Sequence, residues 1–277
     1  DDKLKEQYAT KQPYGEWLDN NLINLCDLKI PNKKVPTHTK EERARLQKAF
    51  GYTYEDFRTS ILPMALNGAE SIGAMGIDTP LAVLSNRHQP LFNYFKQLFA
   101  QVTNPPIDSI REKVVTSTTV YLGTEGNILE EKAENCKQLR INDPILTNTD
   151  LLKIKNMNVE GFKVETIPII YYKNTSLERA IDHLFVEVDR AHREGANIII
   201  LSDRGVDENH VAIPSLLAVA ALQQYLVQTK KRTSMAVILE SGEPRDVHHF
   251  ATLLGYGASA INPYLAQESI QELIDLH

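Results

Sequence analysis

The segment NIIILSDRG, residues 197–205, indicates the fold of the second half of this chain. Asn197–Leu201 is an unbroken apolar run of the length of a strand that is buried on both faces. An amphipathic helical pattern, Leu177–Glu194, comes before it and is ended by Gly195. Polar residues begin at Ser202, where the strand should end. A long helix, a buried strand and a polar loop in this order are typical of parallel α/β architecture.

The same alternation of strand and helix continues on both sides of this segment. An apolar run precedes it at Ile167–Tyr172, and helix–strand pairs follow it at Pro214–Thr229 with Met235–Leu239 and at Asp246–Leu254 with Ala258–Ile261. Four strands separated by helices predict right-handed βαβ units on a parallel sheet. A closed TIM barrel needs eight strands. The count therefore leaves open two forms of α/β fold with flanking helices, a partial barrel or a small open sheet.

The first half of the chain, residues 1–150, is irregular and helical, with short pieces joined by loops. Thr39–Phe50 predicts a helix in which Thr39 is the N-cap. Thr53 and Asp56 have the spacing of a capping box and predict the start of another helix. Val114–Leu122 is rich in valine and threonine and is compatible with either a helix or a strand.

Composition excludes several classes of protein. With 277 residues, 42% of them hydrophobic, the chain can form one large domain or two small ones. A net charge of -6 argues against binding to nucleic acid, which requires a clustered basic face. No apolar run approaches the roughly 20 residues of a membrane span. The only two cysteines, Cys26 and Cys136, are too few and too far apart for a disulfide scaffold or a CxxC metal site. We therefore expect a cytoplasmic protein without nucleic-acid or membrane partners.

Two polar loops follow predicted strands, and the first is Ser202-Asp203-Arg204-Gly205. Ligands of parallel α/β folds bind at the carboxyl edge of the sheet, so Asp203 and Arg204 are candidate site residues. A purely structural role is the alternative, in which Asp203 pairs with Arg204 or caps neighbouring backbone.

The second loop, Glu240–Asp246, leads into His248 and His249. Adjacent side chains on a helix point about 100° apart, so the two histidines do not face one metal ion. Asp246 is better explained as a helix cap. The G-x-G at Gly255–Gly257 follows a helix instead of opening one, which favours a C-cap over a phosphate-binding loop. No GxSxG, P-loop or HExxH motif is present, and we expect no catalytic, cofactor-binding or metal-binding residue in this chain.

Longer stretches carry a resemblance to a known family. They are GAMGIDTPLAVLSNRHQPLFNYFKQLFAQVTNPPIDSIRE at Gly73–Glu112, YGEWL at Tyr14–Leu18, FGYT at Phe50–Thr53, SDRG at Ser202–Gly205, IPSLLA at Ile213–Ala218 and ESGEPRDVHHFATLLGYGASAINPY at Glu240–Tyr264. These stretches resemble the central domain of the glutamate synthase large chain, in either its ferredoxin-dependent or its NAD(P)H-dependent form. The resemblance implies that residues 1–50 lead out of an amidotransferase domain and that residues 51–277 form the central domain, a rudimentary version of an FMN barrel.

The resemblance also implies what the parent enzyme does. It is an oxidoreductase acting on CH–NH₂ donors that makes glutamate from glutamine and 2-oxoglutarate. Ammonia passes from the amidotransferase domain to an FMN-binding domain, and the parent carries FMN and a 3Fe-4S cluster. The catalytic cysteine, the cluster ligands and the flavin site belong to those other domains, which are the expected partners. The central domain joins and spaces them.

The resemblance leaves one group of residues to place, those that touch the neighbouring domains. Asn104-Pro105-Pro106 is a rigid turn, because each proline fixes φ and Asn104 is held extended. We expect this turn, with Asp203 and Arg204, to lie against the missing domains. The chain has no initiator methionine, so we interpret it as an excised domain. The alternatives are a free-standing small α/β enzyme that binds flavin or a phosphate ligand, and a regulatory binding module.

Overall fold

The computed structural model describes residues 1–72, 79–96 and 106–276. Asn104 and Pro105 lie outside the described residues, as does the part of the predicted helical run Leu91–Val102 that follows Lys96. The described part of that run forms a 3-10 helix at Leu91–Phe95. Among the described residues, no helix has the length and apolar character needed to cross a membrane.

The centre of the fold is a four-stranded sheet in which all neighbours are parallel. Its strands, in spatial order, are β4 (Val164–Pro168), β6 (Ile198–Ser202), β8 (Ala236–Glu240) and β9 (Ala260–Asn262). The helices that connect them are α8 (Leu177–Arg193), α9 (Ser215–Gln228) and α10 (Val247–Gly255). Spatial order follows chain order, as it does in a barrel. The predicted α/β fold is confirmed, and the arrangement is consistent with part of a barrel.

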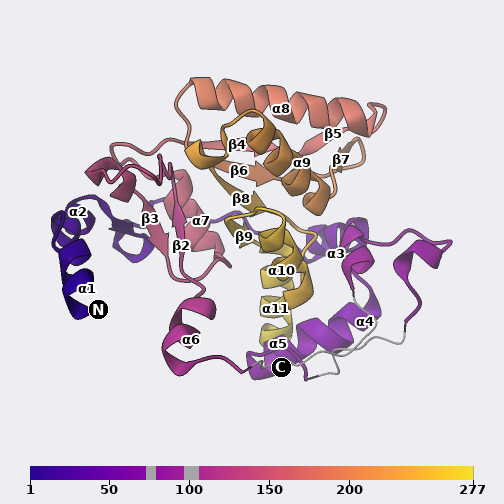
Figure 1. Ribbon diagram of the computed structural model, residues 1–277. Coiled ribbons are helices and arrows are strands. Elements are labelled where there is room, and N and C mark those ends of the chain that lie inside the picture. The colour runs from indigo at the N-terminus through magenta and orange to yellow at the C-terminus, as the bar shows by residue number, and fades with distance from the viewer. Residues whose placement is uncertain (73–78, 97–105, 277) are drawn as a thin grey trace.

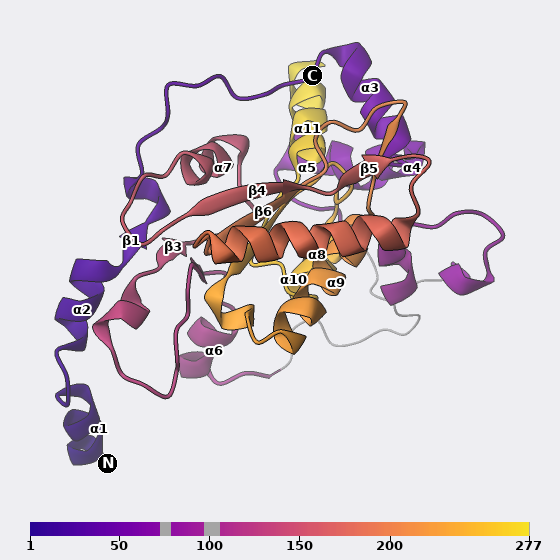
Figure 2. The same cartoon turned by 90° about the horizontal axis from the view of Figure 1, so that it is seen from above.

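Both faces of this sheet are buried. Ile199 and Leu201 of β6 pack with α8, α9 and α10 in one hydrophobic cluster. Ile198 and Ile200 pack on the other face with α7 (Asn148–Lys155). Figure 2 shows α8 on one side of β4 and β6 and α7 on the other. Because successive side chains of a strand point to opposite faces, a strand covered on both sides must be apolar throughout, which explains the sequence at 198–201.

Two smaller sheets complete the strands. β1 (Ile23–Asn24) is parallel to β3 (Leu139–Ile141), and β2 (Val120–Leu122) is antiparallel to β3. β5 (Ile170–Tyr172) pairs antiparallel with β7 (His210–Ala212).

Two sequence predictions are refined by these strands. The run Ile167–Tyr172, predicted as one strand, is divided between β4 and β5. Pro168, which has no N–H to donate, ends β4 at the edge of the sheet, where proline is tolerated. The ambiguous stretch Val114–Leu122 contains both kinds of structure, because α6 (Ser109–Val115) ends there and β2 follows.

The N-terminal half consists of short helices. They are α1 (Asp2–Ala9), α2 (Tyr14–Asn21), α3 (Lys40–Ala49), α4 (Tyr54–Asp56) and α5 (Leu62–Asn67), with a π-helical turn at Phe57–Ile61 and 3-10 turns at Leu25–Asp27, Ala82–Leu84 and Ala133–Cys136. In the second half, a further 3-10 turn at Arg232–Ser234 lies between α9 and β8. The capping boxes of Thr39 with Glu42 and of Thr53 with Asp56 are both formed. The C-terminal helix α11 (Tyr264–Leu276) packs beside α3 and α5. In Figure 1, α1 and α2 lie to one side of the main body.

Candidate functional site at the carboxyl edge of the sheet

The carboxyl ends of β6 and β8 bring together the two polar loops that the sequence singles out. Asp203, directly after β6, is only 1% exposed. Its carboxylate accepts hydrogen bonds from the Ser241 hydroxyl at 2.5 Å, the Gly242 backbone N–H at 3.1 Å and the Tyr264 hydroxyl at 2.9 Å. Asp203 therefore binds the loop after β8 and the Tyr264 hydroxyl. Of the two structural roles considered from the sequence, the capping of neighbouring backbone is found and the pair with Arg204 is not.

Arg204 binds the last residue of β8 instead. Its Nε lies 2.5 Å from Glu240 Oε1, and Lys155 Nζ lies 2.6 Å from Glu240 Oε2. The Arg204 guanidinium also stacks on the Tyr264 ring, 4.0 Å from the ring centroid. Burial by itself raises the pKa of Glu240, but the two cations outweigh it and hold this pKa below its ordinary value.

The pKa of Asp203 shifts in the opposite direction. Burial raises it to about 7, although the donors Ser241, Tyr264 and Gly242 favour the charged form and the charge of Glu243 opposes it. The three donors are neutral, so no cation compensates for the loss of water. Asp203 is therefore protonated up to nearly neutral pH.

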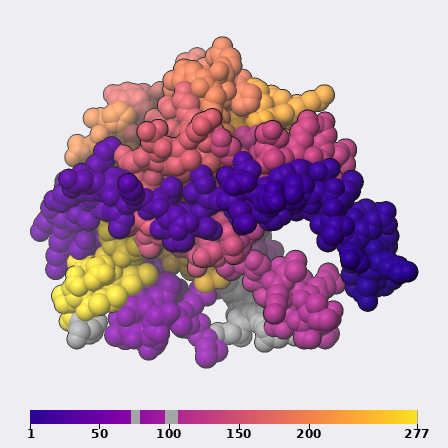
Figure 3. All heavy atoms as spheres, turned by 90° about the vertical axis from the view of Figure 1, so that its left-hand side faces the viewer, coloured from indigo at the N-terminus to yellow at the C-terminus, as the bar shows by residue number. Residues whose placement is uncertain are grey.

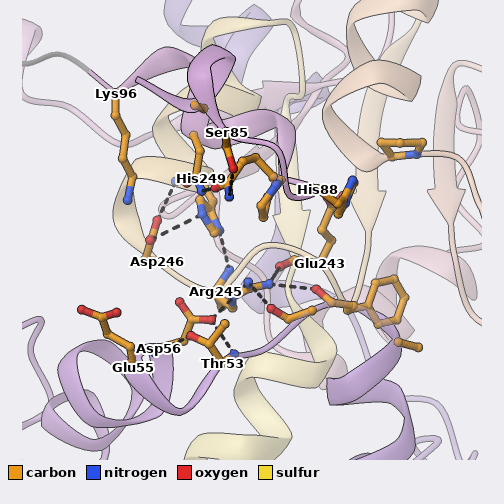
Figure 4. Close-up of a pocket in the computed structure, with 18 of the residues that line it drawn as sticks. Thr53, Glu55, Asp56, Ser85, His88, Lys96, Glu243, Arg245, Asp246 and His249 are labelled. Carbon is orange, nitrogen blue, oxygen red and sulfur yellow. Dashed lines mark hydrogen bonds and ion pairs between the residues drawn. The ribbon is translucent and has the colours of Figure 1, made fainter. Parts of the chain in front are cut away.

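Arg245, in the loop after β8, ties the N-terminal half to this edge. Its guanidinium, in a residue that is 3% exposed, donates to the carbonyl oxygens of Phe50 at 3.2 Å and Gly51 at 3.0 Å. It also pairs with Asp56 at 3.2 Å and lies over the Tyr52 ring, 4.5 Å from its centroid. Figure 4 shows Arg245 between Glu243 and Asp56, at the inner wall of a cleft.

The two adjacent histidines bind different partners. His249 Nδ1 accepts a hydrogen bond from the Arg245 backbone N–H at 3.2 Å, and its ring stacks on Phe92 at 4.2 Å between centroids. His248 Nε2 lies 2.9 Å from the Phe92 carbonyl oxygen. Burial lowers the pKa of His249 to about 3, so this ring is neutral. Asp246 caps α10 as predicted, by accepting from the His249 N–H at 2.8 Å. Across the described parts of the chain, no group of three or more His, Cys, Asp or Glu could hold a metal ion.

A cleft of about 1330 Å³ lies beside this edge. Its walls come from residues 49–60 and 79–96, the loop after β6, residues 211–214 and the loop after β8 with the start of α10. Its ionisable lining residues are Glu55, Asp56, His88, Lys96, Asp207, Glu243, Arg245, Asp246 and His249 (Figure 4). Carboxylates outnumber cations in this lining, which disfavours a phosphate group as its occupant.

The helix N-termini beside the cleft are already occupied by carboxylates of this chain. Glu243 Oε2 accepts from the Ser215 N–H at 2.7 Å and from the Ser215 hydroxyl at 2.5 Å, at the first residue of α9. Asp246 does the same at α10. An N-terminus at this edge is where an α/β fold binds an anionic ligand. Here the chain's own side chains take that place.

The predicted contact residues that the structure describes differ in exposure. Asp203 is buried, Arg204 is partly exposed and Pro106 is exposed, whereas Asn104 and Pro105 lie outside the described residues. The G-x-G element is a helix end, as predicted, since Gly257 with φ of 111° follows α10. Sequence reasoning missed Tyr264, although its place directly after the fourth strand puts it at the same edge.

No pattern in the sequence near Arg245 indicated that its side chain would be buried. Its partners, Phe50 and Gly51, lie 195 and 194 residues away in the sequence. The contact of Gly242 with Phe50 was equally hidden. A Cβ added at Gly242 would lie 2.7 Å from the Phe50 ring.

Comparison with known proteins is consistent with these features. The family model described as the glutamate synthase central domain matches residues 45–277. The chain is 44% identical to the glutamate synthase [NADPH] large chain of Bacillus subtilis over 99% of its own length, and 40% identical to ferredoxin-dependent glutamate synthase 2 of Synechocystis over 98%. It is 40% identical to glutamate synthase [NADH] of Schizosaccharomyces pombe over 99%.

The chain spans only a small part of these relatives, 18% of the first two and 14% of the third. The matched region nevertheless includes the whole parallel sheet and both polar loops. This chain belongs to the glutamate synthase central domain family.

Proposed function

We propose that this chain is the connecting domain of a glutamate synthase large chain and has no activity alone. It joins a glutamine amidotransferase domain to an FMN-binding synthase domain and fixes their spacing, so that ammonia is channelled in glutamate synthesis. The FMN and the 3Fe-4S cluster are carried by the synthase part, and the enzyme works in the cytoplasm. Membership of the family supports this role, as does the small share of the relatives' length that the chain spans.

One observation carries the proposal: the polar groups at the carboxyl edge of the sheet are paired with one another. At the position where parallel α/β folds bind ligands, the Asp203 carboxyl group accepts hydrogen bonds from three donors of this chain, and Glu240 pairs with two of its cations. Glu243 fills the N-terminus of α9. An edge whose polar groups are paired with one another supports rigidity and not turnover.

Rigid spacing matters for the transfer of ammonia. Free ammonia becomes protonated or diffuses away unless the two reaction sites are held in a fixed relation that excludes water. A well-packed sheet supplies such a relation, because close-packed interiors deform little.

We further propose that the turn Asn104-Pro105-Pro106 and the loop after β6 lie against the neighbouring domains. Within that loop, Asp203 and Arg204 position the backbone from inside, since the Asp203 carboxyl group accepts from Tyr264 and the Arg204 guanidinium binds Glu240 and stacks on Tyr264. The exposed contact surface is then the following stretch, residues 207–209.

The experiment for the lack of activity uses the 277-residue chain itself. The purified chain should hydrolyse no glutamine and should convert no 2-oxoglutarate when FMN and a reductant are supplied. Turnover of either substrate above the level of a heat-denatured sample would contradict the proposal.

The alternative function is that of a small enzyme that binds flavin or a phosphate ligand, for which the cleft beside the edge would be the binding site. Titration of FMN with the chain, followed by flavin fluorescence, separates the two functions. The connecting role predicts a colourless protein and no quenching that saturates. A yellow protein, or saturable binding at micromolar FMN, would favour the enzyme.

A further inference from the structure

Residues 29–51, called the strap here, run from the small sheet to the carboxyl edge of the large one. Just before the strap, Ile23, Leu25 and Leu28 pack against the core, and β1 pairs with β3. Residues 29–38 are all described and form neither helix nor strand. Figure 3 shows the N-terminal part of the chain as an indigo and violet band across the face in view.

The middle of the strap is held to α11 by polar contacts. Glu268 accepts a hydrogen bond from the His38 backbone N–H at 3.3 Å, and it lies 3.0 Å from the ring Nδ1 of the same residue. Arg43 Nε donates to Glu272 at 2.9 Å. The pair Gln47 and Ser269 is joined by a hydrogen bond of 2.8 Å.

The end of the strap covers the loop after β8. Phe50 lies against Gly242, and the carbonyl oxygens of Phe50 and Gly51 accept from the Arg245 guanidinium. Just beyond the strap, the Tyr52 hydroxyl donates to the Gly242 carbonyl oxygen at 3.0 Å. The strap therefore covers Gly242 and Arg245 in the loop after β8.

The strap and what it covers differ sharply in burial. None of residues 1–60, all of them described, is buried, whereas Ser241, Arg245 and Glu268 are. A segment with no buried apolar side chain and mostly polar attachments belongs to the low end of the range of local stability. The covered residues lie beside the parallel sheet, whose local stability belongs to the high end of that range.

We propose that the strap opens as a unit while the parallel sheet stays folded, so that it acts as a lid over the carboxyl edge. Opening removes two carbonyl acceptors from Arg245 and uncovers Gly242, whose amide donates to Asp203. It also widens the cleft, because Phe50 and Gly51 form part of its wall. The proposal concerns this chain alone and stands whether or not the chain has the connecting role.

Amide hydrogen exchange of the 277-residue chain, followed by NMR, tests the lid. The reporter is the Gly242 amide, which donates to Asp203, and the reference is the Ile200 amide in the middle of β6. Arg43→Ala removes one charged attachment of the strap. It should speed exchange at Gly242 about tenfold or more, tenfold being the lower end for the loss of a hydrogen bond to a charged group, and leave Ile200 unchanged.

Two further variants make the test decisive. Glu272→Gln removes the same ion pair from the side of α11 and should reproduce the effect of Arg43→Ala. Arg190→Ala removes partly exposed ion pairs with Glu187 and Glu194 of α8 and its C-cap and with Glu165 of β4, far from the strap in sequence, and should not speed exchange at Gly242. The lid is overturned if Gly242 and Ile200 accelerate together in Arg43→Ala, or if Gly242 does not accelerate.

Discussion

Two buried carboxyl groups at the carboxyl edge, one after β6 and one at the end of β8, have opposite electrostatic settings. Asp203 is surrounded by neutral donors, and its pKa rises to about 7. Glu240 lies between Lys155 and Arg204, and its pKa falls. The two side chains share the same edge, so burial alone does not decide ionisation. The presence of a cation within hydrogen-bonding distance decides it.

The two settings show how the carboxyl groups at this edge are held by the rest of the chain. Glu240 is an ionised group in a buried network that requires its charge. Asp203 is a group that the fold keeps protonated over much of the acid range, while it organises three donors. Each of the two carboxyl groups is bound by partners within this chain.

The largest expected effect is that of removing the charge of Glu240. Glu240→Gln leaves Lys155 and Arg204 without their carboxylate, and breaking a buried ion pair from one side costs about 3–5 kcal/mol. Urea unfolding measures the free energy of unfolding. Asp203→Asn at pH 5, where Asp203 is protonated in the folded state and ionised in the unfolded state, should cost much less, at most about 1 kcal/mol. Equal costs for the two variants would end the distinction between the two carboxyl groups.

Gly242→Ala tests the packing around Asp203. The added Cβ would lie 2.7 Å from the Phe50 ring and 3.0 Å from the Tyr264 hydroxyl. Overpacking of this kind costs about 1–3 kcal/mol and should displace the strap. Gly255→Ala is the matched control, since nothing lies within 4 Å of a Cβ there. A thermal unfolding midpoint as low in Gly255→Ala as in Gly242→Ala would show that the contact with Phe50 is unimportant.

The pH dependence of stability follows from the raised pKa of Asp203. The folded pKa of about 7 exceeds the unfolded value of about 3.9, so the folded state binds more protons between these values. The contribution of Asp203 is fully present below pH 4 and is lost as pH rises to about 7, with a slope of up to about 1.4 kcal/mol per pH unit.

Comparison of the wild type with Asp203→Asn isolates this slope. The difference in their free energies of unfolding, measured from pH 4.5 to pH 7.5, should move steadily in favour of the variant. A difference that is constant with pH would show that Asp203 is ionised throughout. The lowered pKa of Glu240 acts in the opposite sense, since its contribution is lost only as pH falls below about 4.3.

The smallest effect is expected from Tyr264→Phe, which removes one donor from Asp203. The loss of this 2.9 Å hydrogen bond should cost about 1 kcal/mol. It should also raise the pKa of Asp203 further, because a donor to the charged form is gone. Carboxyl chemical shifts followed by NMR titration report that pKa, and a lower pKa in the variant would contradict the assigned role of the hydroxyl.

Local signals were sufficient for the parallel sheet and its helices. Ile198–Leu201 must be apolar on both faces, Thr39 and Thr53 have capping partners three residues away, and Gly195 has a φ of 89° that favours glycine. Each of these features depends on residues close in sequence. That proximity is why the pattern predicted them.

Features that depend on distant residues were not predictable in the same way. β1 is only two residues long and is defined by its partner β3, more than 100 residues later. The place of Phe50 on Gly242 needs the complete fold. The sequence predicted polar loops after β6 and β8, but it could not show that Arg204 of the first would pair with Glu240 before the second.

The proposed connecting role requires that the domain hold the amidotransferase and synthase domains at a fixed spacing for the transfer of ammonia. In the full-length glutamate synthase, the direct measurement is the free ammonium released per glutamine hydrolysed. Replacing Pro105 and Pro106 by glycine, or Asp207 and Glu208 by alanine, should increase that release while glutamine hydrolysis continues. Arg190→Ala on α8 should leave it at the wild-type level. Release that stays at the wild-type level in both the turn and the loop variants would contradict the account.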